Sequence, residues 1–352
     1  MMRVSGEQIV MRAYDICGDL YAVQIRLPKA WTVTEETQNA IRFSLPSFHI
    51  NTHNGKRLLL KPHVYISKRT GYAVVFIRVP FRDESVDALI DKNVFKLRVM
   101  HGDRLVSLFD VADHIYRQVE QRIRHLIKYA YQPTNTRSRD YLVVHVSQVK
   151  GEKWKDLINN NSTLVGLVTG KQDWRMIDPE EVNRIIANKF KYMHQSCVVI
   201  TPSASLLVNT RDNTEKILNT IARVNGEYLE LFVYRELLLN ALNYALRNPK
   251  YSFWRTFTPP KTVFEMEELR LELASLIQSF ESKYFTDPFL QKVVESLDRQ
   301  LQISDLEDSV SQLLNEVSSY HRTIVDSRSV HILAWIEIVF ILIMTALWIL
   351  IR

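Results

Sequence analysis

One stretch of the sequence combines positive charge with aromatic rings in a way that suits phosphate chemistry. Its basic residues are Arg117, Arg122, Arg124 and Lys128, and tyrosines stand among them at positions 116, 129 and 131. Guanidinium and ammonium groups pair with phosphate, and tyrosines can stack on bases, so the pattern is typical of a surface for RNA or anionic lipid. The same charges also suit the solvated face of an ordinary helix, and both interpretations stay open.

Motifs for catalysis or metal binding are absent from the sequence. There is no Walker A motif, no G-x-G-x-x-G loop, no G-x-S-x-G elbow and no H-E-x-x-H helix. His49 and His53 are four residues apart, but the residues around them indicate a strand end and a loop rather than one helix face. We therefore predict no catalytic residues, no metal site and no cofactor, and expect a protein that is not an enzyme.

The last stretch of the chain is almost continuously apolar. Ile332 to Ile351 is a run of 20 residues, which at 1.5 Å per residue is long enough for a hydrocarbon core of about 30 Å. Trp335 and Trp348 lie near its opposite ends, where indoles favour the headgroup region. The sequence therefore predicts a single transmembrane helix at residues 330–351, in contact with membrane lipid.

The charges beside this stretch predict its orientation. Arg322 and Arg328 precede it and only Arg352 follows it. The positive-inside rule then places the bulk of the chain in the cytoplasm, or in a matrix if the membrane is organellar, with the C-terminus across the membrane.

Glu337 is the one charge inside the apolar stretch. An ionised carboxylate in hydrocarbon costs about 2.5–3.5 kcal/mol on insertion scales. Snorkelling or protonation relieves that cost, and so does packing at the polar axis of an oligomer, where Thr345 is a further candidate. Both interpretations stay open.

A heptad pattern precedes the apolar stretch. Residues 262–328 are predicted to form a helical stalk, which restarts at Asp287 as the N-cap and Pro288 as the first helical residue. The pattern predicts either a helical hairpin within one chain or a coiled coil that makes a homo-oligomer. The seam residues alternate spacings of three and four: Ile303, Leu306, Val310, Leu313, Val317, Tyr320 and Ile324.

The elements that must position these residues fall into two predicted domains. Residues 1–135 are predicted to be a basic, β-rich domain that ends in an amphipathic helix over 111–131, with hairpin turns at 68–71 and 101–104. Residues 136–250 are predicted to be an α+β domain, with a strand at 163–169 and helices beginning at Asp178 and near Thr214. Residues 1–150 carry 23 Lys+Arg against 14 Asp+Glu, a net charge of +9, whereas residues 151–352 carry 22 against 25, or −3.

The plan of the last third of the chain resembles a mitochondrial family typified by the protein required for meiotic nuclear division and its yeast sporulation relatives. An aromatic pair, Phe253-Trp254, stands before the stalk, and Ala334-Trp335-Ile336-Glu337 stands in the apolar stretch. The resemblance implies an α/β domain, a coiled coil and a terminal anchor. The order of parts is also similar to that of CorA-type divalent-cation channels, but the second membrane helix and the Gly-Met-Asn loop are missing.

Together these patterns predict an α+β cytoplasmic region, a helical stalk and one C-terminal transmembrane helix. The function expected is that of a membrane-anchored, self-associating protein that is not an enzyme and presents its basic domain to a protein partner or an anionic ligand. Nucleic acid remains open as that ligand. The alternative is an oligomeric ligand-gated pore, or a membrane-disrupting effector, with Glu337 near the subunit axis.

Overall fold

The chain divides into two compact units in the computed structural model. Unit 1 comprises Met1–Glu230 and Tyr284–Ser304, and unit 2 comprises Leu231–Lys283 and Asp305–Arg352. The structure describes residues 2–16, 18–20, 28–37, 40–52, 55, 57–68, 71–94, 97–101, 103–129, 137–171, 173–191, 195–210, 213–247, 287–316, 318–319, 333–334 and 336–341.

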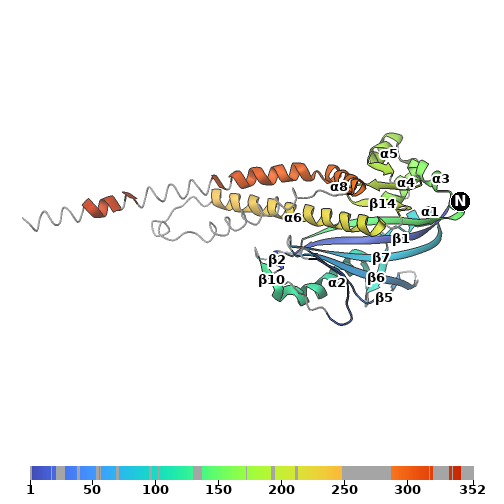
Figure 1. Ribbon diagram of the computed structural model, residues 1–352, viewed down its shortest axis with the longest axis horizontal. Coiled ribbons are helices and arrows are strands. Elements are labelled where there is room, and N and C mark those ends of the chain that lie inside the picture. The colour runs from blue at the N-terminus through green and yellow to red at the C-terminus, as the bar shows by residue number, and fades with distance from the viewer. Residues whose placement is uncertain are drawn as a thin grey trace, which may run out of the picture. The chain divides into compact units, whose positions relative to one another are not determined.

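Unit 1 is built on one large mixed sheet (Figure 1). Its strand order is β12-β13-β14-β11-β1-β7-β6-β5-β8-β9, and β4 pairs with both β6 and β3. The pair β11–β14 is parallel and the other described pairs are antiparallel. The earlier strands of this sheet are β1 (Arg3–Asp15), β3 (Thr32–Glu36), β4 (Ala40–Ser44), β5 (Phe48–Thr52), β6 (Arg57–Ser67) and β7 (Tyr72–Ser85). The later strands are β8 (Arg98–His101), β9 (Arg104–Ser107), β11 (Ser138–Val149), β12 (Lys189–Lys191), β13 (Cys197–Ile200) and β14 (Ala204–Val208).

The predicted hairpins are confirmed. Strands β6 and β7 pair on either side of the turn at 68–71, where Gly71 has a φ of 71°, and β8 and β9 pair across the turn at 101–104. Glycine tolerates a positive φ because it has no Cβ. A separate two-stranded ribbon joins β2 (Gly18–Leu20) to β10 (Ile127–Tyr129). The predicted domain boundary near residue 135 falls between β10 and β11, and residues on both sides of it contribute strands to the large sheet.

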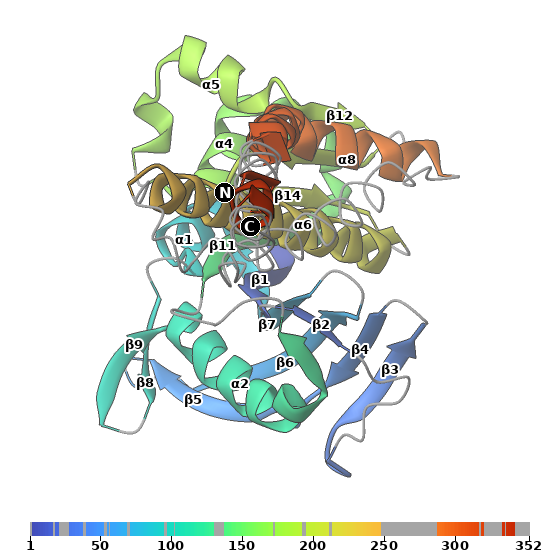
Figure 2. The same ribbon diagram turned by 90° about the vertical axis from the view of Figure 1, so that its left-hand side faces the viewer.

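One face of the sheet, here called the α2 face, is covered by α2 (Leu108–Ile123) and α1 (Val86–Asp91). Ser107 caps α2 in a capping box with Asp110. The apolar residues of α2 recur every three or four positions and pack into one cluster with Phe43, Leu60 and Val64 of the strands. α2 packs mainly against β1 and β7, on the side of the sheet where Figure 2 draws it.

Side chains that alternate with these point to the opposite face, here called the α6 face. The helix α6 (Thr214–Arg247) begins over this face, as Figure 1 shows. Gly226 of α6 lies so close to the buried Tyr72 that an added Cβ would stand 2.2 Å from the tyrosine ring. At the other end of the sheet, α8 (Pro288–Leu301) packs on β13, and the rings of Phe190 and Phe289 meet edge-on with centroids 5.7 Å apart.

Several predicted helix boundaries are confirmed and one is wrong. Asp178 caps α5 (Pro179–Ile186), Asp287 caps α8, and α6 begins at Thr214 as predicted. The helix predicted for 111–131 ends earlier, because α2 passes into a short 3-10 turn, Arg124–Leu126, and then into β10. Unit 1 also contains the helices α3 (Trp154–Asn159) and α4 (Asn161–Thr169) and the 3-10 turns Lys150–Glu152 and Trp174–Met176.

The strand predicted for 163–169 is the helix α4. Asn160 caps its start by accepting a hydrogen bond from the Thr163 N–H, and Gly170 ends it with a φ of 63°. An Asn cap and a left-handed Gly are strong helix signals, whereas a short apolar run of Leu and Val does not distinguish a buried helix from a strand.

The predicted transmembrane helix is contradicted. Among the described residues, no helix is long and apolar enough to cross a membrane. Glu337 is exposed in the described helical run 336–341, which at 1.5 Å per residue extends only about 9 Å. The fold class, the single-pass topology and the sidedness inferred from it are therefore corrected: the described architecture is a mixed sheet with helices on both faces. Trp335, Thr345 and Trp348 lie outside the described residues.

The predicted stalk helix is interrupted. It was expected to continue from Pro288 to residue 327, but Gln302 takes a left-handed φ of 53° and ends α8. Ile303 and Val310 of the predicted seam are buried within one chain, and Leu306 and Leu313 are half-buried. Val317, Tyr320 and Ile324 lie outside the described residues. Self-association along this seam stays a prediction.

Candidate functional site

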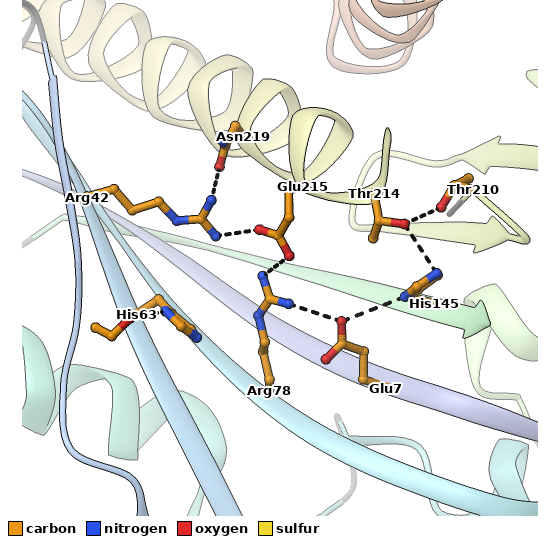
Figure 3. Close-up of polar contacts among 10 residues, drawn as sticks. Glu7, Arg42, His63, Arg78, His145, Thr210, Thr214, Glu215 and Asn219 are labelled. Atoms are coloured by element: carbon orange, nitrogen blue, oxygen red, sulfur yellow. Dashed lines mark hydrogen bonds and ion pairs between the residues drawn. The ribbon is translucent and has the colours of Figure 1, made fainter. Parts of the chain in front are cut away.

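A row of charged side chains, here called the ion-pair chain, crosses the α6 face beneath the start of α6 (Figure 3). Arg42 comes from β4, Arg78 from β7, and Glu215 from the first turn of α6. The Glu215 carboxylate accepts hydrogen bonds from Arg42 Nη2 at 2.8 Å and from Arg78 Nη2 at 2.6 Å. Arg42 also donates to Asn219 Oδ1 at 2.8 Å. A single carboxylate thus ties two strands to the helix.

The ion-pair chain continues across β1 to β11. Arg78 Nη1 donates to Glu7 Oε1 at 3.2 Å, and the same oxygen lies 3.7 Å from His145 Nδ1, an ion-pair distance rather than a hydrogen bond. His145 Nε2 lies 3.3 Å from Thr214 Oγ1, which lies 2.7 Å from Thr210 Oγ1. Five segments far apart in sequence are therefore joined by polar contacts.

The two carboxylates of this chain remain ionised because of their partners. Burial raises the pKa of Glu215, but the charges and hydrogen bonds of Arg78 and Arg42 outweigh it and bring the pKa below its usual value. Burial also raises the pKa of Glu7, and its neighbours His145 and Arg78 again lower it overall. With two arginines and two carboxylates, the ion-pair chain is close to neutral in charge.

His63 of β6 lies beside the two arginines and near Ser44, with Nδ1 and Oγ 2.8 Å apart. Burial, and then the positive charges of Arg78 and Arg42, lower its pKa to about 4. An unfolded histidine titrates near pH 6.5, so between about pH 4 and 6.5 only the unfolded chain takes up this proton. The contribution of His63 to stability is thus present above pH 6.5 and is lost as the pH falls through this window.

We therefore expect His63→Gln to flatten the dependence of the free energy of unfolding on pH between about 4 and 6.5. Urea unfolding at a series of pH values measures it. His49→Gln is the matched control, since His49 is exposed on the neighbouring β5. An unchanged slope in the His63 variant would show that this imidazole takes up its proton equally in both states.

The order Glu7–His145–Thr214 resembles the carboxylate, imidazole and hydroxyl of nucleophilic hydrolases. The geometry does not favour that chemistry. Thr214 is 6% exposed, and Glu7 is held by Arg78 as well as facing His145. The hollow beside the pair is lined by Glu7 and His145 but not by Thr214. The contacts therefore position α6 on the sheet rather than present a nucleophile.

That hollow encloses about 580 Å³ at one end of β1, β7 and β11. The register of β1 shifts at Gly6, where an added Cβ would stand 1.9 Å from the backbone oxygen of His145. Asp83, on β7, has a φ of 47°. Bulges are frequent at sheet ends, and here the hollow lies beside the bulge, with Glu7 and His145 in its wall.

Beyond the start of α6, the α6 face carries exposed basic side chains on β5, β6 and β8. The register pairs Asn51 with Arg57 and with Met100, so residues two positions from these share the same face. No residue of β4, β5, β6, β8 or β9 is acidic. We call this surface the basic sheet face; its exposed polar members are His49, Asn51, Arg57, Lys61 and Arg98.

The basic residues predicted from the sequence lie elsewhere. Arg117 is exposed on α2, and Arg122 and Arg124 are exposed at and after its end, so they belong to the helix that covers the opposite face. Lys128 lies in β10, and its side chain is outside the described part of the chain. His53 is also outside it. No group of three His, Cys, Asp or Glu suited to a metal is found among the described residues.

Comparison with known proteins identifies a family. The family model described as "Uncharacterized protein MJ0711, N-terminal domain" matches residues 5–214. The chain belongs to this family. The matched segment contains nearly all of the large sheet, including the basic sheet face, and ends at the first residue of α6, so Glu215 lies just past it. No curated protein and no solved structure matches the chain. The resemblances to the meiotic-division family and to CorA-type channels stay predictions.

The basic sheet face has one signal in the sequence, which is a long run without acidic residues. From residue 40 to 67 there is no acidic residue, while arginine, lysine and histidine recur. That run crosses β4, β5 and β6. The ion-pair chain has no comparable signal, because Arg78 and Glu215 are 137 positions apart.

Proposed function

We propose that unit 1 is a module, not an enzyme, that binds single-stranded nucleic acid across the basic sheet face. The observation that carries the proposal is the exposure of Arg57, Lys61 and Arg98 on strands that contain no acidic residue. A surface with one sign of charge attracts a polyanion, and phosphate oxygens are natural acceptors for guanidinium and ammonium groups.

The ion-pair chain supports this assignment by setting the edge of the surface. Arg42 and Arg78 are neutralised by Glu215 and Glu7 beneath α6, so they add little to the local potential. The strands beyond them keep exposed cations. An open sheet is the platform that several nucleic-acid-binding folds use.

The exposed neighbours of these cations indicate the mode of binding. Met100 and Leu105 are 38% and 53% exposed, and Asn51 and His49 add polar contacts. Base stacking in sheet-based modules usually depends on aromatic rings, and the described exposed members of this face contain only the imidazole of His49. We therefore expect affinity dominated by phosphate contacts, with strong salt dependence and little sequence preference.

The expected result concerns the triple variant Arg57→Gln, Lys61→Gln, Arg98→Gln. A fluorescent oligouridylate is titrated with the full chain between about 50 and about 200 mM salt. Each phosphate contact on a single strand contributes about 0.7 to the slope of log K against log salt, so losing three lowers the slope by about 2.

The matched control removes the same charge from the other face, by Arg117→Gln, Arg122→Gln and Arg124→Gln. It should bind as the unaltered chain does. An equal loss in the control would return the site to the helix predicted from the sequence. Competition by polyglutamate as effective as by oligouridylate would contradict the nucleic-acid assignment in favour of an acidic protein partner.

A further inference from the structure

A second cavity lies on the α2 face, where the ends of β6 and β7 meet α1. It encloses about 500 Å³, within the range of about 300–1,000 Å³ typical of small-molecule sites. Its lining comes from β1, β5, β6, β7, α1 and the turn after α1. The basic sheet face lies on the opposite side of the same strands, so this cavity is separate from the surface proposed for nucleic acid.

The cavity wall is mainly apolar. Its members are Leu58 of β6, Val79 and Phe81 of β7, Leu89 of α1, and Leu97. Val79 and Leu89 are buried, whereas the other three are half-buried and present part of their surface to the opening. Such a wall suits the body of an apolar molecule, because covering it removes hydrocarbon surface from water.

The cavity is held in shape by Gln8, a buried residue of β1. Its Oε1 accepts a hydrogen bond from the Val94 N–H at 2.8 Å, and its Nε2 donates to the Leu89 carbonyl at 3.5 Å. One amide thus joins the central strand to the end of α1 and to the turn that follows. A pocket built on such contacts is pre-formed, which lowers the cost of binding.

The rim is charged. Lys92 Nζ lies 3.1 Å from Glu84 Oε2, and these two largely cancel. Arg82 is exposed and makes no hydrogen bond or ion pair to another described residue. Outside the Lys92–Glu84 pair, Asp91 is the second exposed charge on the rim. A guanidinium has five donors in a planar fork that fits a carboxylate or sulfonate.

We infer that this cavity binds an amphipathic organic anion. The apolar body lies against Leu58, Val79 and Phe81, and the anionic head pairs with Arg82. Asp91, on the same rim, disfavours that head by its like charge, so it limits the affinity.

Two fluorescent dyes test the inference on the full chain. One is 1-anilinonaphthalene-8-sulfonate, and the other is N-phenyl-1-naphthylamine, which has the same ring system without the sulfonate. We expect one saturable site for each. Arg82→Gln should weaken sulfonate binding about five-fold to ten-fold, Asp91→Asn should strengthen it two-fold or more, and neither should change binding of the neutral dye.

A filling variant checks the location. Leu97 is half-buried, so Leu97→Trp places a bulky indole ring in the opening and should abolish binding of both dyes. Arg57→Gln, on the opposite face, should leave binding of both dyes unchanged. Equal loss of both dyes in Arg82→Gln, or no effect of Arg82 and Asp91 on the sulfonate, would overturn the inference. Those two surface variants keep the test decisive even if Leu97→Trp impairs folding.

Discussion

Replacing Gly226 by alanine is expected to destabilise the protein by about 2 kcal/mol, although the same change inside a helix usually stabilises by up to about 1 kcal/mol. The sign reverses because the new Cβ would stand 2.2–2.7 Å from three atoms of the Tyr72 ring. Tyr72 is fully buried in β7, so its ring has little room to withdraw. Urea unfolding monitored by circular dichroism measures the loss.

A double-mutant cycle separates this clash from an effect on α6 itself. In a Tyr72→Leu background the ring is absent, so Gly226→Ala should become neutral or stabilising. The coupling free energy between the two sites then has the opposite sign to the effect of Gly226→Ala alone. A loss of the same size in both backgrounds would show that the close approach of helix and strand is not its cause.

The second large effect is expected from Arg78→Met, which removes the middle of the ion-pair chain. Breaking one side of a buried pair typically costs about 3–5 kcal/mol. Arg78 is 14% exposed but Glu215 is 50% exposed, and the buried Nε of Arg78 lacks a partner among the described residues. Both observations reduce the cost, so we expect about 2 kcal/mol.

The loss in Arg78→Met should depend on pH. Arg78 helps to hold the pKa of Glu7 and of Glu215 below the usual value, so its contribution is present above the pKa of an unfolded glutamate and disappears as the pH falls through the folded values. Unfolding free energies of the variant and the unaltered chain should therefore converge in acid.

The matched control is Arg184→Met. Arg184 is 77% exposed and pairs with Glu181 within α5, and exposed pairs contribute about 0–1 kcal/mol. An equal loss in both variants, or a loss in Arg78→Met that persists unchanged in acid, would contradict the role assigned to the ion-pair chain.

Local signals predicted much of the fold. The hairpin around Gly71, the Asp178 cap before Pro179 and the helix from Thr214 all follow from neighbouring residues, because turn and cap preferences act over three or four positions. The strand predicted for 163–169 failed because its pattern was too short to separate strand from buried helix. The helix from residue 111 was extended too far because its periodicity continues into β10.

Non-local contacts explain why the site was not predicted. Glu7, Arg42, Arg78 and Glu215 meet only because β1, β4 and β7 lie under α6, and no spacing in the sequence encodes that. The transmembrane prediction rested on hydropathy, length and the two tryptophans near the ends of the apolar stretch, and among the described residues no helix is long and apolar enough to satisfy it. The charge of the basic sheet face, by contrast, is visible in the sequence as the acid-free run from residue 40 to 67. Only the pairing of its strands in one sheet had to be added.

The position of β1 in the middle of the sheet has a consequence for synthesis. β1 precedes both of its partners in the sequence, and its Val10 pairs with Ile77 on one side and with Leu142 on the other. One hydrogen-bonding edge of β1 therefore waits for β7, which ends at Ser85, and the other waits for β11, which ends only at Val149. High contact order slows folding, and an unpaired apolar strand invites aggregation. Nascent chains halted before β11 should therefore bind chaperones, and those extended past α6 should be released.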